Sequence, residues 1–241
     1  MPPPEPRRAQ VALALDVPDR TAALALDARL GEGRRIYKVG LELFTAEGPP
    51  LVRELLEREH RIFLDLKLHD IPNTVARAVE SAARLGVHWL TVHTAGGPGM
   101  LSAAARAERG ALRLVGVTVL TSLDAPALAT VLGRPGVDVQ TEVDRRAGWA
   151  REAGLEAVVC SVAEAARLKD VHGPALELVT PGIRFADQGT DDQARVATPA
   201  GAVRAGADLL VIGRAVTAAA DPRGALARVL AETEAAGAVR A

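Results

Sequence analysis

Short apolar runs alternate with longer alanine-rich segments along the whole chain. Runs rich in Val, Leu and Ile are typical of buried β-strands, and apolar residues spaced three or four apart are typical of helices. We expect strands near residues 10–16, 35–39, 61–67, 88–93, 112–120, 155–160, 175–180 and 208–212. We expect helices between them, for example at 41–59, 73–85, 99–109, 141–153, 162–170 and 199–206.

The alternation of eight strands with helices predicts an α/β fold, because a strand, a helix and a further strand form a right-handed parallel unit. Eight such units in 241 residues indicate a (β/α)8 TIM barrel, a single domain spanning 1–241 with residues 1–9 as a flexible N-terminal extension. An open doubly wound sheet is the alternative. The first strand is not followed by GxGxxG, which disfavours its dinucleotide-binding form.

Polar residues stand at the carboxyl ends of nearly all the expected strands. In a TIM barrel these ends and the loops after them form the active site. The residues are Asp16, Lys38, Asp65, Lys67, His93, Thr121, Ser122, the segment TPGIR at 180–184 and the segment IGR at 212–214.

The third expected strand continues into the segment FLDLKLHDIPNT at 63–74. Side chains alternate across a strand, so Asp65 and Lys67 should face the barrel mouth while the leucines between them face the helices. Together with Lys38 and Asp70 they would form an array of alternating charges, suited to giving a proton to a carbanion. The alternative, a salt bridge on a solvated strand edge, does not suit a closed barrel.

Two loops on the other side of the mouth are suited to binding phosphate. The segments TPGIR and IGR supply glycines, backbone N–H groups, Arg184 and Arg214 after the seventh and eighth strands. Many barrels bind phosphate there, and a guanidinium group binds phosphate through paired hydrogen bonds. A small phosphorylated ligand is therefore expected. Asp70 and Thr74 are expected in a loop over the barrel mouth, and the alternative for Thr74 is a simple first-turn or capping residue of the next helix.

Composition excludes several other classes of protein. The net charge is −1 without a basic stripe, so nucleic-acid binding is not expected. Neither a signal peptide nor an apolar run of membrane-spanning length is visible, and we expect a soluble, cytoplasmic protein. The single cysteine, Cys160, is interpreted as a buried core residue. His93 could be a general base but fits a core or supporting role better, and His172 is expected at the surface or beside a strand.

These motifs together resemble the orotidine 5′-phosphate decarboxylase family. FLDLKLHDIPNT resembles the family's DxKxxDIPNT signature. Order and spacing also agree over residues 10–220 for the segments ALALDV (12–17), YKVGLELF (37–44), VTVLTSL (117–123), TPGIR (180–184), DDQARVATP (191–199) and VIGRAV (211–216).

The resemblance implies a homodimeric barrel that converts orotidine 5′-monophosphate into UMP and CO2 without a metal or an organic cofactor. It implies that Lys67 protonates C6 of the pyrimidine, that Asp65 holds Lys67, and that Lys38 completes the array and contacts the ribose. Asp70 and Thr74 would reach into the partner's site. The remaining implied substrate contacts are Asp16 with the ribose, Thr121, Ser122 and Pro181 with the pyrimidine, and Gln193, Gly213, Arg214 and Arg184 with the phosphate.

Two other functions are compatible with parts of the pattern. Metal-dependent sugar-phosphate decarboxylases and hexulose-phosphate aldolases share the DxKxxD strand and use its carboxylates to hold magnesium. The DIPNT segment with the two arginine loops favours the pyrimidine enzyme. A non-catalytic barrel that senses a nucleotide is the other possibility, but the complete charged array disfavours it.

Overall fold

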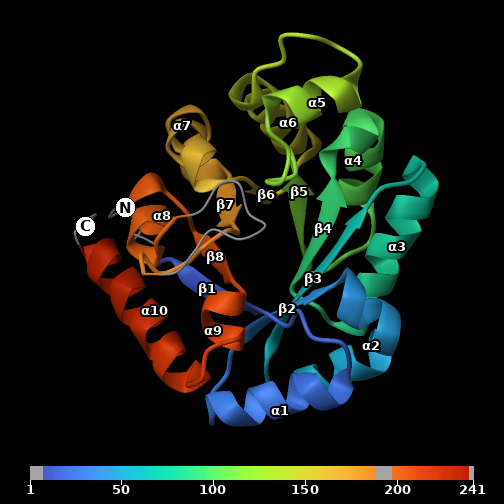
Figure 1. Ribbon diagram of the computed structural model, residues 1–241. Coiled ribbons are helices and arrows are strands. Elements are labelled where there is room, and N and C mark those ends of the chain that lie inside the picture. Colours follow the sequence, from blue (N-terminus) through green and yellow to red (C-terminus); the bar gives the residue numbers. More distant parts are fainter. Residues whose placement is uncertain (1–7, 188–196, 239–241) are drawn as a thin grey trace, which may run out of the picture.

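The computed structural model describes residues 8–187 and 197–238, so most of the expected N-terminal extension lies outside the described residues. Within them, parallel strands β1 to β8 pair in chain order and close into a barrel (Figure 1). The predicted (β/α)8 fold is confirmed, and an open sheet is excluded. The strands are β1 Gln10–Ala14, β2 Ile36–Gly40, β3 Arg61–Leu68, β4 Trp89–His93, β5 Arg113–Val117, β6 Ala157–Val159, β7 Glu177–Thr180 and β8 Leu209–Ile212.

Helices surround this barrel (Figure 1). Gly48, with a φ of 60°, kinks α2 just before two prolines, so the expected helix over 41–59 is divided. The helices are α1 Arg20–Leu30, α2 Leu41–Glu57, α3 Pro72–Leu85, α4 Gly97–Arg106, α5 Ala125–Leu132, α6 Val139–Ala153, α7 Val162–His172, α8 Pro199–Ala205, α9 Arg214–Thr217 and α10 Pro222–Ala238, with short 3-10 turns at Thr94–Gly96 and Gly173–Ala175. In the described part of the chain, none of the helices is long and apolar enough to cross a membrane.

Two apolar clusters hold the barrel together. The larger lies between the strands and the helices and includes the buried side chains of Leu64 and Leu90. The smaller fills the barrel interior, where Phe63 and Trp89 pack against small residues such as Ala12. Because successive strand residues point to opposite sides, each strand contributes to both clusters. The interior cluster fills the lower part of the barrel, and a cavity lies above it at the carboxyl ends of the strands.

Candidate active site

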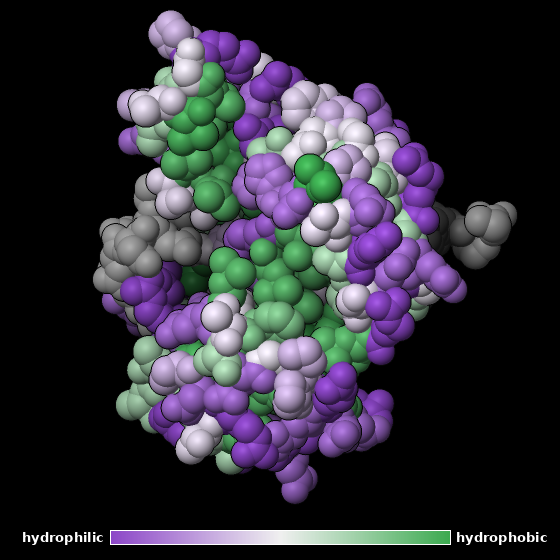
Figure 2. Space-filling model, turned by 90° about the vertical axis from the view of Figure 1, so that its right-hand side faces the viewer, coloured by the Kyte–Doolittle hydropathy of each residue, from purple (hydrophilic) through white to green (hydrophobic). Residues whose placement is uncertain are grey.

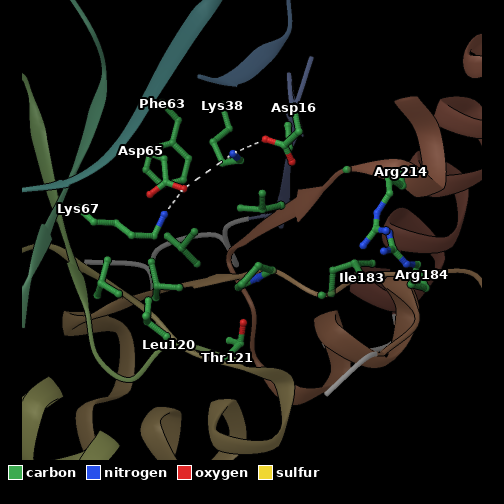
Figure 3. Close-up of a pocket in the computed structure, with 18 of the residues that line it drawn as sticks. Asp16, Lys38, Phe63, Asp65, Lys67, Leu120, Thr121, Ile183, Arg184 and Arg214 are labelled. Carbon is green, nitrogen blue, oxygen red and sulfur yellow. Dashed lines mark hydrogen bonds and ion pairs between the residues drawn. The ribbon is translucent and has the colours of Figure 1, made fainter. Parts of the chain in front are cut away.

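A cavity of about 430 Å³ opens at the carboxyl ends of the strands (Figure 3). This volume is in the range of sites for small-molecule ligands. Its lining combines apolar side chains such as Phe63, Val119 and Ile183 with a small set of charged ones. Of the residues singled out from the sequence, the cavity brings together Asp16, Lys38, Asp65, Lys67, Thr121, Pro181, Arg184, Gly213 and Arg214.

Four charged side chains of alternating sign follow one wall of this cavity (Figure 3). Lys67 Nζ lies 2.8 Å from Asp65 Oδ2, and Lys38 Nζ lies 3.8 Å from the same oxygen. Lys38 Nζ also donates a hydrogen bond of 2.9 Å to Asp16 Oδ1. Burial strengthens such contacts, and the side chains of Lys38 and Asp65 are only 11% and 14% exposed. The order Asp16–Lys38–Asp65–Lys67 differs from the expected array because Asp16 occupies its first position.

Gly40 leaves the space that the Asp16–Lys38 pair requires. A Cβ atom at this position would lie 3.0 Å from Lys38 Nζ and 3.6 Å from Asp16 Oδ1. Such a Cβ would press on an ammonium group already held by a hydrogen bond. The glycine of the YKVG segment therefore has a steric role at the site.

The end of β3 departs from regular strand geometry. β3 pairs with β4 at Leu64 and again at Leu68, but the partners of these two residues on β4 are only two positions apart. Residues 65–67 of β3 consequently lie opposite Thr91 alone, which makes this a β-bulge. Despite the bulge, Lys67 reaches the same cavity as Asp65, while Leu66 and Leu68 pack against the outer apolar cluster.

Lys67 has a left-handed backbone conformation, with a φ of 50°. For a residue with a side chain this conformation costs about 1–2 kcal/mol. Its backbone N–H donates a hydrogen bond of 2.7 Å to Thr91 Oγ1, and the Thr91 hydroxyl donates one of 3.0 Å to Asp65 Oδ1. Sequence reasoning missed Thr91, because a threonine inside a strand carries no signal of its own.

The other end of the cavity is cationic. Figure 3 shows the guanidinium groups of Arg184 and Arg214 at the end away from Lys67. Arg184 is 9% exposed, and its backbone N–H donates to Ala197 O over 2.9 Å. Ala197 N donates in turn to Gly182 O, so a short parallel bridge ties the two ends of the loop after β7. This end of the cavity is suited to an anionic group.

Among the described residues, three that were expected at the site do not line this cavity. Asp70 and Thr74 are exposed, and Asp70 Oδ1 accepts a hydrogen bond from the N–H of Ile71. Thr74 lies in the first turn of α3, and Ser122 is exposed in the loop after β5. Gln193 lies outside the described residues.

His93 and Cys160 are placed as supporting residues. The ring of His93 stacks on that of His69, with the centroids 5.4 Å apart, and does not line the cavity. Burial, followed by the nearby charge of His69, lowers the pKa of His93 to about 4, so the ring is neutral at pH 7. Cys160 is 1% exposed, and burial raises the pKa of its thiol to about 12, which makes it an inert core residue.

A model of the orotidine 5′-phosphate decarboxylase / HUMPS family matches residues 9–229. The chain belongs to this family. Among curated relatives, orotidine 5′-phosphate decarboxylase of Moorella thermoacetica is 49% identical over 233 residues, covering 93% of this chain and 92% of that one. The family member of the same name from Nitrosospira multiformis is 48% identical over 226 residues, covering 93% and 94%.

Two solved structures have a similar fold. The crystal structure of orotidine 5′-phosphate decarboxylase from Lactobacillus acidophilus superimposes with a TM-score of 0.82 at 32% identity, covering 94% of this chain and 99% of that one. An uncharacterized conserved protein from Geobacillus kaustophilus gives a TM-score of 0.81 at 37% identity, covering 92% and 99%. The family barrel therefore extends over nearly the whole chain.

Proposed function

We propose that this protein decarboxylates orotidine 5′-monophosphate to UMP and CO2 in pyrimidine biosynthesis, in the cytoplasm, without a metal or an organic cofactor. One observation carries the proposal: a single cavity has the alternating Asp16–Lys38–Asp65–Lys67 chain along one wall and two arginines at its far end. The names of the curated relatives supply the substrate.

The lysine–carboxylate wall is where the chemistry takes place. The bond between C6 and the carboxyl carbon breaks, CO2 leaves, and the electron pair stays on C6. Lys67 Nζ then gives a proton to C6, and the amine regains a proton from water. Asp65 holds this ammonium group 2.8 Å away and places negative charge near the departing carboxylate. Lys38 supplies a second positive charge as the carbanion develops, and it contacts the ribose.

The far end of the cavity binds the part of the substrate that does not react. Arg184 and Arg214 bind the phosphate together with Gly213 and Gln193, while Asp16 contacts the ribose. Thr121, Ser122 and Pro181 contact the pyrimidine. Binding energy from the remote phosphate helps to fix the reacting ring against Lys67, which raises the rate as well as the affinity.

A homodimer completes the site in this proposal. Asp70 and Thr74 are exposed and do not line the cavity of their own subunit, and the neighbouring Ile71 is 67% exposed. Figure 2 shows hydrophobic side chains gathered across the middle of the side on which α2 and α3 lie. Leu41, at the start of α2, is 55% exposed. If a second subunit covered this surface, Asp70 and Thr74 of one subunit would lie at the cavity of the other.

The metal-dependent branch of the family is the second candidate, since it shares the Asp–Lys strand. The surroundings of Asp65 disfavour it. Asp65 Oδ2 faces two ammonium groups and Oδ1 accepts the Thr91 hydroxyl, so both oxygens already have partners where a magnesium ion would need them.

One assay tests the proposal. Purified protein is mixed with orotidine 5′-monophosphate in a metal-free buffer containing excess EDTA, and the pyrimidine absorbance is followed. We expect complete conversion to UMP. Activity that disappears with EDTA and returns with magnesium would favour the metal-dependent branch. Tight binding of UMP without any turnover would indicate a nucleotide sensor.

A further inference from the structure

Thr91 lies inside the barrel, next to the bulge in β3. It is fully buried, and it faces the interior one layer above Trp89 because side chains alternate along β4. It is also the one residue of β4 that lies opposite the bulge at 65–67 of β3. The backbone ladder is interrupted there, so the Lys67 N–H needs a partner other than a strand carbonyl.

The Thr91 hydroxyl satisfies two groups at once. Its oxygen accepts the Lys67 N–H at 2.7 Å, and its single proton is directed to Asp65 Oδ1 at 3.0 Å, since a carboxylate can only accept. Asp65 Oδ2 is left to face the ammonium groups of Lys67 and Lys38, at 2.8 Å and 3.8 Å. One side chain thus fixes both the rotation of the carboxylate and the backbone from which the lysine extends.

We propose that Thr91 is a positioning residue for the reaction, one that holds Lys67 in its left-handed conformation and Asp65 in a single rotation. This inference rests on the proposed decarboxylation. Without the hydroxyl, the Lys67 N–H loses its partner, the left-handed conformation loses its support, and Asp65 is held only by the two ammonium groups. The Lys67 ammonium group is then displaced from the reacting carbon, while the arginine end of the cavity is unchanged.

Two matched pairs of side chains isolate the hydroxyl. Wild type and Thr91→Val differ by a hydroxyl in place of a methyl group, and Thr91→Ser and Thr91→Ala differ by the hydroxyl alone. We expect kcat to fall roughly 10- to 100-fold within each pair, as for a displacement of about 1 Å at a reacting group. The affinity for UMP, measured by calorimetry, should stay unchanged. If Thr91→Val folds poorly, the kcat of Thr91→Ser compared with that of Thr91→Ala tests the inference.

Thr233→Val is the matched control for stability. Its hydroxyl is also buried, but it donates to Val229 O within α10, away from the cavity. This variant should lower the melting temperature while kcat stays at the wild-type value. Full kcat in both Thr91→Val and Thr91→Ala would refute the inference. A Thr91→Ser variant as slow as Thr91→Ala would refute it too. Either result would leave the proposed function intact. An inactive wild-type protein would instead refute the proposed function, and the inference with it.

Discussion

At the scale of single residues, the two lysines of the site differ although they share one carboxylate oxygen. Lys38 is enclosed between Asp16 and Asp65, and its side chain is 11% exposed. Lys67 has one carboxylate contact, and its side chain is 33% exposed where the cavity opens. A group that gives up a proton and regains it from water needs that access. Under the proposed reaction, this difference favours Lys67 as the proton donor and Lys38 as a fixed positive charge.

Replacing Lys67 tests this assignment. Lys67→Ala removes the proton donor, so we expect kcat to fall by roughly 10²- to 10⁴-fold or more, the usual contribution of a general acid. Lys67→Arg is the matched variant, since a guanidinium group keeps the charge but gives up its proton very poorly. Both variants should still bind UMP in a calorimeter. Near-normal turnover by either of them would contradict the role of Lys67.

The phosphate end is tested by Arg214→Ala. A guanidinium group binds phosphate through paired, charge-assisted hydrogen bonds, so its loss should weaken UMP binding about 10- to 100-fold, corresponding to roughly 1.5–3 kcal/mol. Uridine lacks the phosphate and serves as the control ligand, whose affinity should change little. Equal losses for UMP and uridine, measured by calorimetry, would count against a phosphate site here.

Single-residue details were only partly predictable. The alternation of FLDLKL places Asp65 and Lys67 at one cavity. The same regular alternation conceals the bulge, because two extra residues in a strand leave no signature when every second position is apolar. The Asp16–Lys38 contact depends on the pairing of β1 with β2, where Ala14 lies opposite Lys38. Strand register of this kind is set by packing and cannot be inferred from hydrophobicity alone.

At the scale of elements, α6 fixes the end of β5 through a buried ionic cluster. Glu142, only 2% exposed, contacts Arg134, Arg145 and Arg146. Arg146 is also buried and donates to the carbonyl oxygen of Thr118, just beyond β5. Burial alone would raise the pKa of Glu142, but hydrogen bonds from Arg146 and Arg145 outweigh it and hold the pKa below its ordinary value. The cluster therefore anchors the loop that carries Thr121.

Glu142→Ala should destabilise the protein by about 3 kcal/mol, because it leaves the buried Arg146 charge without its carboxylate. Arg145→Ala is the matched control. Its side chain is 43% exposed, so its loss should cost less than about 1 kcal/mol. Urea unfolding measures both values. Equal costs for the two variants would contradict a structural role for the buried pair.

At the scale of the whole molecule, three histidines make stability depend on pH. Burial lowers the pKa of His88, His93 and His172 from the ordinary value of 6.5, and that of His93 falls to about 4. The unfolded chain therefore binds more protons than the folded one below pH 6.5, and the free energy of unfolding falls as the pH is lowered from 6.5 towards 4. Above pH 6.5 these histidines are neutral in both the folded and the unfolded state, so they no longer lower the free energy of unfolding.

Urea unfolding between pH 7.5 and 4.5 measures this dependence. The free energy of unfolding should decline less steeply in His93→Gln than in the wild type, since one of the displaced titrations is removed. An identical slope in the two proteins would show that His93 is not involved.

The proposed sharing of sites between subunits has its own test at this scale. Lys67→Ala and Asp70→Ala should each be inactive, but mixing them under subunit exchange should restore about a quarter of wild-type activity, because half the dimers are hybrids with one intact site of two. Two differently tagged wild-type proteins provide the control for exchange. No recovery after proven exchange would contradict the shared site.

The overall fold could be predicted from the sequence because every level of the pattern agrees on it. Strand-length apolar runs, helices between them and polar strand ends all indicate a closed parallel barrel. Burial of individual side chains was less predictable. His172 was expected at the surface or beside a strand but is 9% exposed at the end of α7, so this prediction was wrong. A polar residue at a helix end gives no sign of which neighbours will cover it.

The filled interior of the barrel restricts how molecules enter and leave the cavity. Phe63, Trp89 and their small neighbours close the lower half, and Arg61 stacks over the Trp89 ring at 4.3 Å beneath them. Among the described residues, this apolar layer lies between the cavity at the carboxyl ends and a second pocket at the amino ends, which Arg61 and Trp89 line. The nucleotide, the departing CO2 and the water that restores the lysine proton would then use the opening at the carboxyl ends. Under the proposed reaction, the order in which they pass is then part of the catalytic cycle, and loops at this opening would govern turnover without touching the reacting carbon.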